Sequence, residues 1–277
     1  MTKRLRRLGL AVFVGLLPTV VHGQAVKYVR YELEGSNRYG ILSGDVIEEL
    51  TGPPYADGAP TGTSVSANRV RLLAPIEPGK VIAVGLNYRS HLGGRTPAEY
   101  PGLFAKMPTS IVGPEAAIVI PADAANLHYE GELVVVIGER ASNVSVEDAD
   151  DYVFGVTAGN DVSERDWQNA DLQWFRAKAS DTFGPVGPVL ATGLDYDDLL
   201  LETRLNGETR QSERSADLIF GIAEIVSYIS RYVTLEPGDA IFTGTPGTTR
   251  AMTHGDVVEV EVEGVGVLRN HVVREGG

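Results

Sequence analysis

Alternation of apolar and polar residues is the dominant pattern along this chain. Residues 26–50 alternate around two glycines, as short antiparallel strands joined by turns do. The runs 80–85 and 132–138 are rich in β-branched residues and contain or end in glycine, which predicts strands buried on both faces. Valine and glutamate alternate over 257–263, and a final strand is expected over 267–273. Strands therefore dominate, and their order is not that of repeated βαβ units.

Helical spacing is clear in one segment only. Between residues 219 and 229, apolar residues recur at intervals of three and four, which is the spacing of an amphipathic helix. Ser215 or Asp217 is a suitable residue to cap its start. A second, shorter helix is expected soon after a strand that ends near residue 160, with Ser163 and Asp166 as its capping pair. The pattern predicts a mainly β fold with α+β elements.

A connector divides the chain into two predicted regions. Residues 51–68 are rich in Gly, Pro, Thr and Ser, which is typical of loops. We therefore expect a small N-terminal β meander with its linker at residues 24–68. The larger main domain is expected at residues 69–277.

The N-terminus resembles an export signal. Residues 1–23 contain four basic residues and no acid, and the segment 8–21 is an apolar run. This arrangement predicts a signal peptide at residues 1–23 and an exported protein, periplasmic or secreted. An uncleaved N-terminal anchor is the alternative. No other stretch is long and apolar enough to cross a bilayer, so no stable membrane span is expected after cleavage.

Composition and charge narrow the chemistry. The 277 residues include no cysteine, which excludes disulfides, thiolate metal sites and a cysteine nucleophile. There are 24 Lys and Arg against 37 Asp and Glu, giving a formal charge of −13. Nucleic-acid binding is not expected, because Lys and Arg would have to supply the affinity for phosphates. Small molecules and cations are the expected ligands.

Three acidic residues suggest a metal site. On a strand, Glu130 and Glu132 would point to the same face, next to the apolar run that follows them. Taken alone, the pair could also be two solvated acids at an exposed strand end. Asp161 adds a third carboxylate at the end of another expected strand. Three carboxylates form an all-oxygen site suited to Mg²⁺, Mn²⁺ or Ca²⁺ rather than zinc.

Five segments, in order, resemble the fumarylacetoacetate hydrolase family, and the resemblance extends from about residue 80 to residue 273. It implies a mixed β-sandwich roll, usually a homodimer, that acts on small 2-oxo, β-diketo or dienol acids. It also implies that Glu130, Glu132 and Asp161 hold Mg²⁺ or Mn²⁺. The five segments are 84–91, 128–133, 160–168, 175–188 and 239–248.

The same resemblance implies roles for five further residues. His91 matches the family's general base, and Lys178 matches a lysine that lines the substrate site and holds a carboxylate or a developing enolate. Arg165 and Gln168 match residues that contact substrate oxygens, and Thr245 matches a contact to the substrate carboxylate. Four of the five have a plainer alternative: His91 and Lys178 could be surface residues, Arg165 could form a structural ion pair, and the segment around Thr245 could be only a turn.

One departure from the family affects the expected reaction. Many members carry a glutamate three residues beyond the histidine, where this chain has Gly94; Glu99 is a possible substitute. The leading expectation is hydrolysis of a carbon–carbon bond in a 2-oxo or β-diketo acid, such as an acylpyruvate or a fumarylacetoacetate-like compound. Decarboxylation, hydration or isomerisation of a 2-oxo or 2-hydroxydienoic acid at the same metal site is the alternative. A non-catalytic binding protein is a third possibility.

Overall fold

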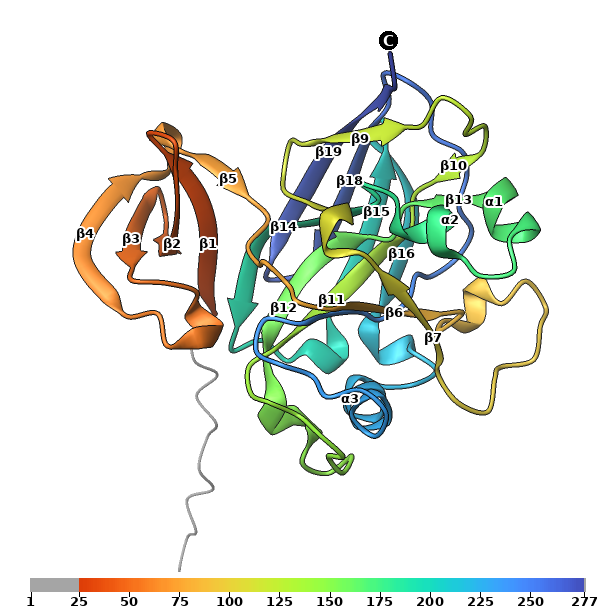
Figure 1. Cartoon of the computed structure of the whole chain (residues 1–277), viewed down its shortest axis with the longest axis horizontal. Helices are drawn as coiled ribbons and strands as arrows, with labels where there is room; N and C mark the ends of the chain where they lie inside the picture. The colour runs from red at the N-terminus through yellow and green to blue at the C-terminus, as the bar shows by residue number, and fades with distance from the viewer. Residues whose placement is uncertain (1–24, 277) are drawn as a thin grey trace, which may run out of the picture.

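The computed structural model of this chain describes residues 25–276. The predicted signal peptide, residues 1–23, lies outside them. The first strands form a meander, drawn in red and orange in Figure 1. Its first strand also pairs with a strand of the main body, so the meander continues the large sheet. These strands are β1 (Val26–Leu33), β2 (Ser36–Ser43), β3 (Val46–Leu50), β4 (Pro60–Ser66) and β5 (Arg71–Leu73).

The main body extends this sheet in the order β14, β12, β11, β17, β6, β7, with the short β8 beside β14. Every residue of β11 is buried, because strands flank it on both sides and side chains cover both faces. The bounds are β6 (Val81–Gly85), β7 (Gly102–Lys106), β8 (Ile111–Val112), β11 (Gly131–Ile137), β12 (Val153–Asn160), β14 (Gly184–Thr192) and β17 (Ala240–Phe242).

A second sheet packs against the first. Leu133 and Val135 of the large sheet lie in one apolar core with Leu201 and Val260 of the smaller one. This confirms the predicted mixed, mainly β fold. The smaller sheet has the order β16 (Glu208–Arg214), β15 (Leu200–Leu205), β18 (Val257–Val262), β19 (Gly266–Arg274) and β9 (Ala117–Ile120), and β10 (Leu127–His128) pairs separately with β13 (Ser163–Glu164).

The predicted amphipathic helix exists but starts later than expected. It is α3 (Ile222–Ser230), below the main sheet in Figure 1. Residues 215–217 form only a short 3-10 turn, and residues 219–220 form a bend before the helix. The reason is tertiary: Asn87 exchanges hydrogen bonds with Phe220 through its side-chain amide and accepts one from the Ile219 N–H through its carbonyl. These contacts keep residues 219 and 220 out of the helix, which begins after Gly221.

The second predicted helix is capped by a different residue. Helix α1 (Arg165–Ala170) begins after Glu164, whose carboxylate accepts a 2.7 Å hydrogen bond from the Trp167 N–H. The predicted Ser163–Asp166 capping pair is therefore wrong. The Ser163 hydroxyl donates instead to the Asp161 carbonyl, 2.8 Å away. Helix α2 (Phe175–Ala179) follows after residues 171–174 and packs beside α1.

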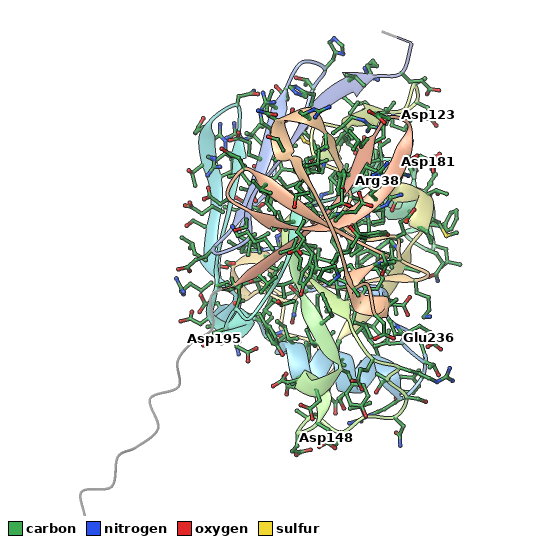
Figure 2. The ribbon with its side chains drawn as sticks, turned by 90° about the vertical axis from the view of Figure 1, so that its left-hand side faces the viewer. Arg38, Asp123, Asp148, Asp181, Asp195 and Glu236 are labelled. Atoms are coloured by element: carbon green, nitrogen blue, oxygen red, sulfur yellow. The ribbon has the colours of Figure 1, made fainter. Side chains whose placement is uncertain are left out.

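Charged side chains such as Asp148, Asp195 and Glu236 lie at the periphery of the molecule (Figure 2). Within residues 25–276, no helix combines the length and the apolar character that a bilayer span requires.

Candidate active site and metal centre

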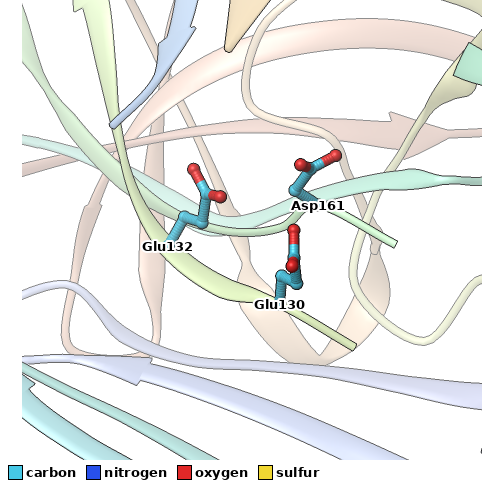
Figure 3. A group of neighbouring side chains, drawn as sticks. All are labelled: Glu130, Glu132 and Asp161. Carbon is cyan, nitrogen blue, oxygen red and sulfur yellow. The ribbon is translucent and has the colours of Figure 1, made fainter. Parts of the chain in front are cut away.

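Two neighbouring strands bring the three predicted acids together. Glu132 lies in β11 and Glu130 immediately precedes this strand, whereas Asp161 immediately follows β12. In the antiparallel pairing, Gly131 faces Asn160. This register places all three carboxylates at one end of the strand pair, with one oxygen of each within 4.8 Å of the others (Figure 3).

All three acids are buried, but the pKa values of Glu130 and Glu132 are shifted in opposite directions. Their exposed fractions are only 1% to 4%. Burial tends to raise the pKa of Glu130, but Lys178 and Arg165 outweigh it and hold this pKa well below its usual range. Burial also raises the pKa of Glu132, and repulsion from Asp161 and Glu130 raises it further. Glu132 therefore carries the least compensated charge of the three.

Lys178 bridges two of the acids. Its ammonium nitrogen donates to Glu130 and, at 2.6 Å, to Asp161. Burial alone would lower the pKa of Lys178, but the two carboxylates raise it, so the ammonium form is stabilised. The lysine lies in α2 with an exposed fraction of 2%. The plain alternative of a surface lysine is therefore excluded.

Lys106 is a second buried lysine at this site, and sequence reasoning did not identify it. Its ammonium nitrogen lies 2.6 Å from Oδ1 of Asp161 and also donates to the Lys178 carbonyl. Burial lowers the pKa of Lys106, while Asp161 opposes that shift. One feature of the sequence could have indicated its burial: Lys106 lies between apolar residues of β7 and Met107, and β7 pairs with the predicted buried strand β6.

Arg165 and Gln168 lie one helical turn apart in α1 and are joined by a 2.7 Å hydrogen bond. Arg165 also donates to Glu130 and, at 3.0 Å, to Thr249. Its guanidinium is therefore already paired with an acid of the site. The bond to Arg165 uses the carbonyl oxygen of Gln168, which leaves the Gln168 NH₂ group available beside the cavity.

His91 faces the acids with one ring nitrogen. Its Nδ1 lies 2.6 Å from the Gly247 carbonyl oxygen, which can only accept a hydrogen bond. Nδ1 therefore carries the proton in the neutral ring, and Nε2 is the basic nitrogen. Nε2 lies 3.4 Å from Glu130. Nδ1 is thus held by a neutral carbonyl, and the Glu130 carboxylate lies on the Nε2 side of the ring.

Thr245 lines the cavity, but its hydroxyl is engaged with the protein. It donates to the Gly131 carbonyl and accepts from Gln211, each at 2.8 Å. Gln211 also accepts from the Gly131 N–H at 3.1 Å. Together these contacts fix the backbone between Glu130 and Glu132. Gln211 is a further positioning residue that no pattern in the sequence singles out.

A cavity of about 300 Å³ opens over these groups. Neither Gly94 nor Glu99 is in its lining, and both are exposed. The proposed substitution of Glu99 for the missing glutamate therefore has no support in this geometry. The cavity residues that the sequence predicted are His91, Glu130, Glu132, Asp161, Arg165, Gln168, Lys178 and Thr245.

The donor set fits a hard divalent cation. Three convergent carboxylates provide only oxygen ligands, as Mg²⁺ and Mn²⁺ prefer. Glu132 accepts a 2.8 Å hydrogen bond from the Gly244 N–H but has no ion-pair partner within the described part of the chain. A cation held by Glu130, Glu132 and Asp161 would compensate that buried charge.

Comparisons with known proteins found two family models and several relatives that match this chain. Residues 80–273 match the family model of the fumarylacetoacetate hydrolase C-terminal domain, and residues 26–75 match the Rv2993c-like N-terminal model. Protein Rv2993c of Mycobacterium tuberculosis is 46% identical, over 82% of this chain and 88% of its own length. Rat mitochondrial oxaloacetate tautomerase Fahd2a is 39% identical, over 76% of this chain and 71% of its own length.

The solved structures that resemble this chain include an isomerase. The 5-carboxymethyl-2-hydroxymuconate delta-isomerase structure from Mycobacterium smegmatis has a TM-score of 0.86 and 42% identity. The match covers 90% of this chain and all of that one. This isomerase structure is thus similar to the chain in both sequence and fold over its whole length.

The prediction of an exported, periplasmic or secreted protein is wrong. Two of the relatives, the rat and bovine oxaloacetate tautomerases, are named as mitochondrial proteins, not as exported ones. A basic start followed by an apolar run was the whole basis of that prediction, and it says nothing about the domain that follows.

The acid triad, its buried lysine and the match over residues 80–273 lead to one assignment: this chain belongs to the fumarylacetoacetate hydrolase family.

Proposed function

We propose that this chain is a divalent-metal-dependent enzyme that catalyses keto–enol isomerisation of a 2-oxo acid. One observation supports this most directly: the basic Nε2 of His91 and the ammonium of Lys178 lie beside the same three buried carboxylates. Enolisation needs a proton acceptor near a group that stabilises negative oxygen, and the site offers both. The names of the relatives, a tautomerase and an isomerase, agree with this reaction.

His91, Lys178 and Gln168 would each have a separate role in this reaction. His91 would take a proton from C3 of the 2-oxo acid and deliver it to the oxygen on C2, which gives the enol; the reverse transfer, from the enol O–H to C3, gives the keto form. Lys178 uses two of its three N–H donors on Glu130 and Asp161, which leaves one for the oxygen that becomes negative. The Gln168 NH₂ group would position the carboxylate. A bound Mg²⁺ or Mn²⁺ would supply Lewis-acid polarisation of the 2-oxo group.

Carbon–carbon bond hydrolysis, the leading expectation from the sequence, requires His91 to act as a stronger base, because it must activate water. Water is far less acidic than a carbon between two carbonyl groups, so its activation needs a strongly supported imidazolium. A carboxylate beside Nδ1 provides that support in hydrolytic triads. Here Nδ1 is held by the Gly247 carbonyl, and Gly94 stands where many family members have glutamate. This contact favours isomerisation over hydrolysis.

The test compares the reactions on the purified chain. The enol form of oxaloacetate is followed by ultraviolet absorbance, acetylpyruvate is followed by release of acetate and pyruvate, and decarboxylation is followed by release of CO₂. We expect the enol signal to decay faster with chain and Mg²⁺, and the acceleration to disappear with a chelator. If acetate is released faster than the enol decays, the chain is a hydrolase and not an isomerase. If CO₂ is released faster, it is a decarboxylase. Tight binding of these acids without any turnover would support the third possibility, a non-catalytic binding protein.

We also propose that the chain forms a homodimer, as the family resemblance implies. Large apolar side chains are exposed at Leu172, Phe175 and Tyr232, with exposed fractions from 63% to 96%. Burial of such residues is typical of subunit interfaces. Light scattering on the chain, which has a mass of 29.7 kDa, should give twice that mass. A monomer mass at micromolar concentration would contradict the dimer.

A further inference from the structure

His91 lies in a segment that gives its ring little support. It ends a three-residue 3-10 turn (Arg89–His91), and residues 93–96 after it are exposed. So short a turn does not fix the direction of the ring by itself. The contact that fixes it comes from the Gly247 carbonyl, 2.6 Å from Nδ1 and 156 residues away in sequence. The orientation of His91 therefore depends on how Gly247 is held.

Gly247 is held by Ser90, the neighbour of His91. The Gly247 N–H donates to the Ser90 hydroxyl oxygen at 2.8 Å. Residue 247 thus contacts two consecutive residues, Ser90 through its N–H and His91 through its carbonyl. Its φ of 61° lies in the left-handed region, which glycine adopts without strain. In this conformation both polar groups of its backbone meet the same short turn.

Glu213 orients the Ser90 hydroxyl. Glu213 lies in β16 of the smaller sheet, and its Oε2 accepts a 2.6 Å hydrogen bond from Ser90. A hydroxyl has one proton to donate, and its lone pairs accept. Because the proton goes to the carboxylate, the oxygen is free to accept from the Gly247 N–H. A hydrogen bond to an ionised carboxylate is also stronger than one to a neutral acceptor. Three consecutive contacts therefore connect Glu213 with the imidazole.

Ser90 and Glu213 can act on the reaction only through other residues. Neither side chain is in the lining of the acid-lined cavity. The loop that carries Gly247 has separate anchors on both sides, since the Pro246 carbonyl accepts from Gln211 at 2.6 Å and Thr249 accepts from Arg165 at 3.0 Å. Loss of the Ser90 hydroxyl would thus release Gly247 while the rest of the loop stays attached.

We propose that Ser90 and Glu213 are positioning residues, which hold His91 in the orientation and the tautomer that a base at Nε2 requires. They do not themselves transfer a proton in the reaction. This inference rests on the proposed function, in which His91 is the base. It adds an acid that supports His91 through two intervening groups, in a chain that has Gly94 where many family members have glutamate.

Four variants test the series of contacts. Ser90→Ala removes the hydroxyl, and Ser90→Thr keeps it. Glu213→Leu removes the acceptor, and Glu213→Gln keeps an acceptor oxygen without the charge. Ser90 is exposed, so its replacement by alanine leaves no cavity in the core.

A matched pair of residues provides the controls. The Ser212 hydroxyl donates to Glu202 at 3.2 Å, also on the smaller sheet, and neither residue is in the cavity lining. Ser212→Ala and Glu202→Leu therefore remove the same kind of contact without touching Gly247.

The first measurement is the decay of the oxaloacetate enol on the full chain with Mg²⁺. Ser90→Ala and Glu213→Leu should each lower kcat roughly 3- to 10-fold, which corresponds to the loss of one hydrogen bond. KM should stay within about twofold, because neither residue reaches the cavity. Ser90→Thr should restore kcat, and Glu213→Gln should lie between Glu213→Leu and the unmodified chain.

The second measurement is the tautomer of His91, which a general loss of stability would not change. Ring nitrogen chemical shifts of the chain labelled with ¹⁵N-histidine report which nitrogen carries the proton. Spectra are recorded with Mg²⁺, at a pH well above the ordinary imidazole pKa of about 6.5. The His91 signals are those that are absent from His91→Ala. We expect the Nδ1–H form in the unmodified chain, Ser90→Thr and both controls, and a mixture with the Nε2–H form in Ser90→Ala and Glu213→Leu.

The inference requires both changes in Ser90→Ala and in Glu213→Leu. An unchanged tautomer or an unchanged kcat in either variant would contradict it, and so would equal changes in Ser212→Ala and Glu202→Leu. If the unmodified chain does not isomerise oxaloacetate, the proposed function fails. The tautomer measurement then still decides whether Ser90 and Glu213 position the ring of His91.

Discussion

The ammonium nitrogen of Lys106 lies 2.6 Å from Oδ1 of Asp161, and both side chains are almost completely buried. Lys178 holds the other oxygen of the same carboxylate at 2.6 Å. One buried acid is thus fixed from two sides by two lysines. This arrangement offsets part of the repulsion among the three acids and leaves the orientation of Asp161 with little freedom.

Replacing Lys106 with methionine should destabilise the chain strongly. The substitution keeps the length of the side chain but leaves Asp161 with one of its two cationic partners. Loss of one partner from a buried ion pair costs about 3 kcal/mol of unfolding free energy. Urea denaturation measures this loss. As a control, Arg140→Met at the exposed Arg140–Glu236 pair should change the free energy by no more than about 0.5 kcal/mol; similar losses in both variants would contradict a special role for Lys106.

Glu132→Gln should have opposite effects with and without a divalent cation. Burial, Asp161 and Glu130 raise the pKa of Glu132, so its charged form destabilises the cation-free chain at neutral pH. Glutamine removes that charge and still accepts the Gly244 N–H bond. Without cation, the melting temperature should rise by roughly 2–4 °C, the shift that 1 kcal/mol gives for this chain length.

The same variant should lose the thermal stabilisation that Mg²⁺ gives. In the unmodified chain, Mg²⁺ at about 100 times its dissociation constant should add roughly 2.7 kcal/mol to the unfolding free energy. Thermal melts with Mg²⁺ and with a chelator measure both effects on both proteins. If the Glu132→Gln variant gains as much from Mg²⁺ as the unmodified chain, Glu132 is not a ligand.

His91→Ala should reduce isomerisation by about 10² to 10⁴-fold, the usual contribution of a general base. The dissociation constant for Mg²⁺ should stay within about twofold, because His91 is not one of the three acids. Decay of the oxaloacetate enol and a Mg²⁺ titration give the two numbers. His254→Ala is the control, since His254 lies outside the cavity; an equal loss of activity in both variants would remove His91 from the mechanism.

Asp197→Asn should make the chain more stable at neutral pH and not at acidic pH. Burial, together with Asp150 and Asp195, raises the pKa of Asp197, and Asp195 lies at the edge of the molecule in Figure 2. A raised folded-state pKa contributes stability below the unfolded pKa, and this stability is lost as the pH rises through the folded pKa. At pH 7 the variant should therefore melt higher, and the difference should vanish near pH 3, below the ordinary aspartate pKa of about 3.9.

The exposed Asp181 is the control for this pH dependence. Asp181→Asn should melt at the same temperature as the unmodified chain at both pH values. A gain for Asp197→Asn that persists at pH 3 would point to a cause other than carboxylate repulsion.

Local sequence patterns were sufficient to predict those strands and helices whose structure depends mainly on their own residues. The apolar residues of β11 and the helical spacing of apolar residues in α3 are visible in the sequence itself, because these side chains must be buried. The acid triad was predictable for the same reason, because Glu130 and Glu132 are two residues apart and Asp161 ends the neighbouring strand.

Contacts between distant segments were not predictable from these patterns. The start of α3 depends on Asn87, which is more than 130 residues away in sequence. The first turn of α1 is capped by Glu164 because Ser163 is drawn into the hydrogen bonds of Asp161 and Glu130. Lys106 shows its role only when β7 is placed beside β6 in the sheet.

Crystals grown with Mn²⁺ and oxamate test the central claim most directly, through the anomalous scattering of manganese. We expect one strong anomalous peak per chain, with oxygens of Glu130, Glu132 and Asp161 as ligands and oxamate oxygens completing the coordination. Manganese bound elsewhere, or oxamate bound away from these three carboxylates, would contradict a metal centre that holds a 2-oxo acid.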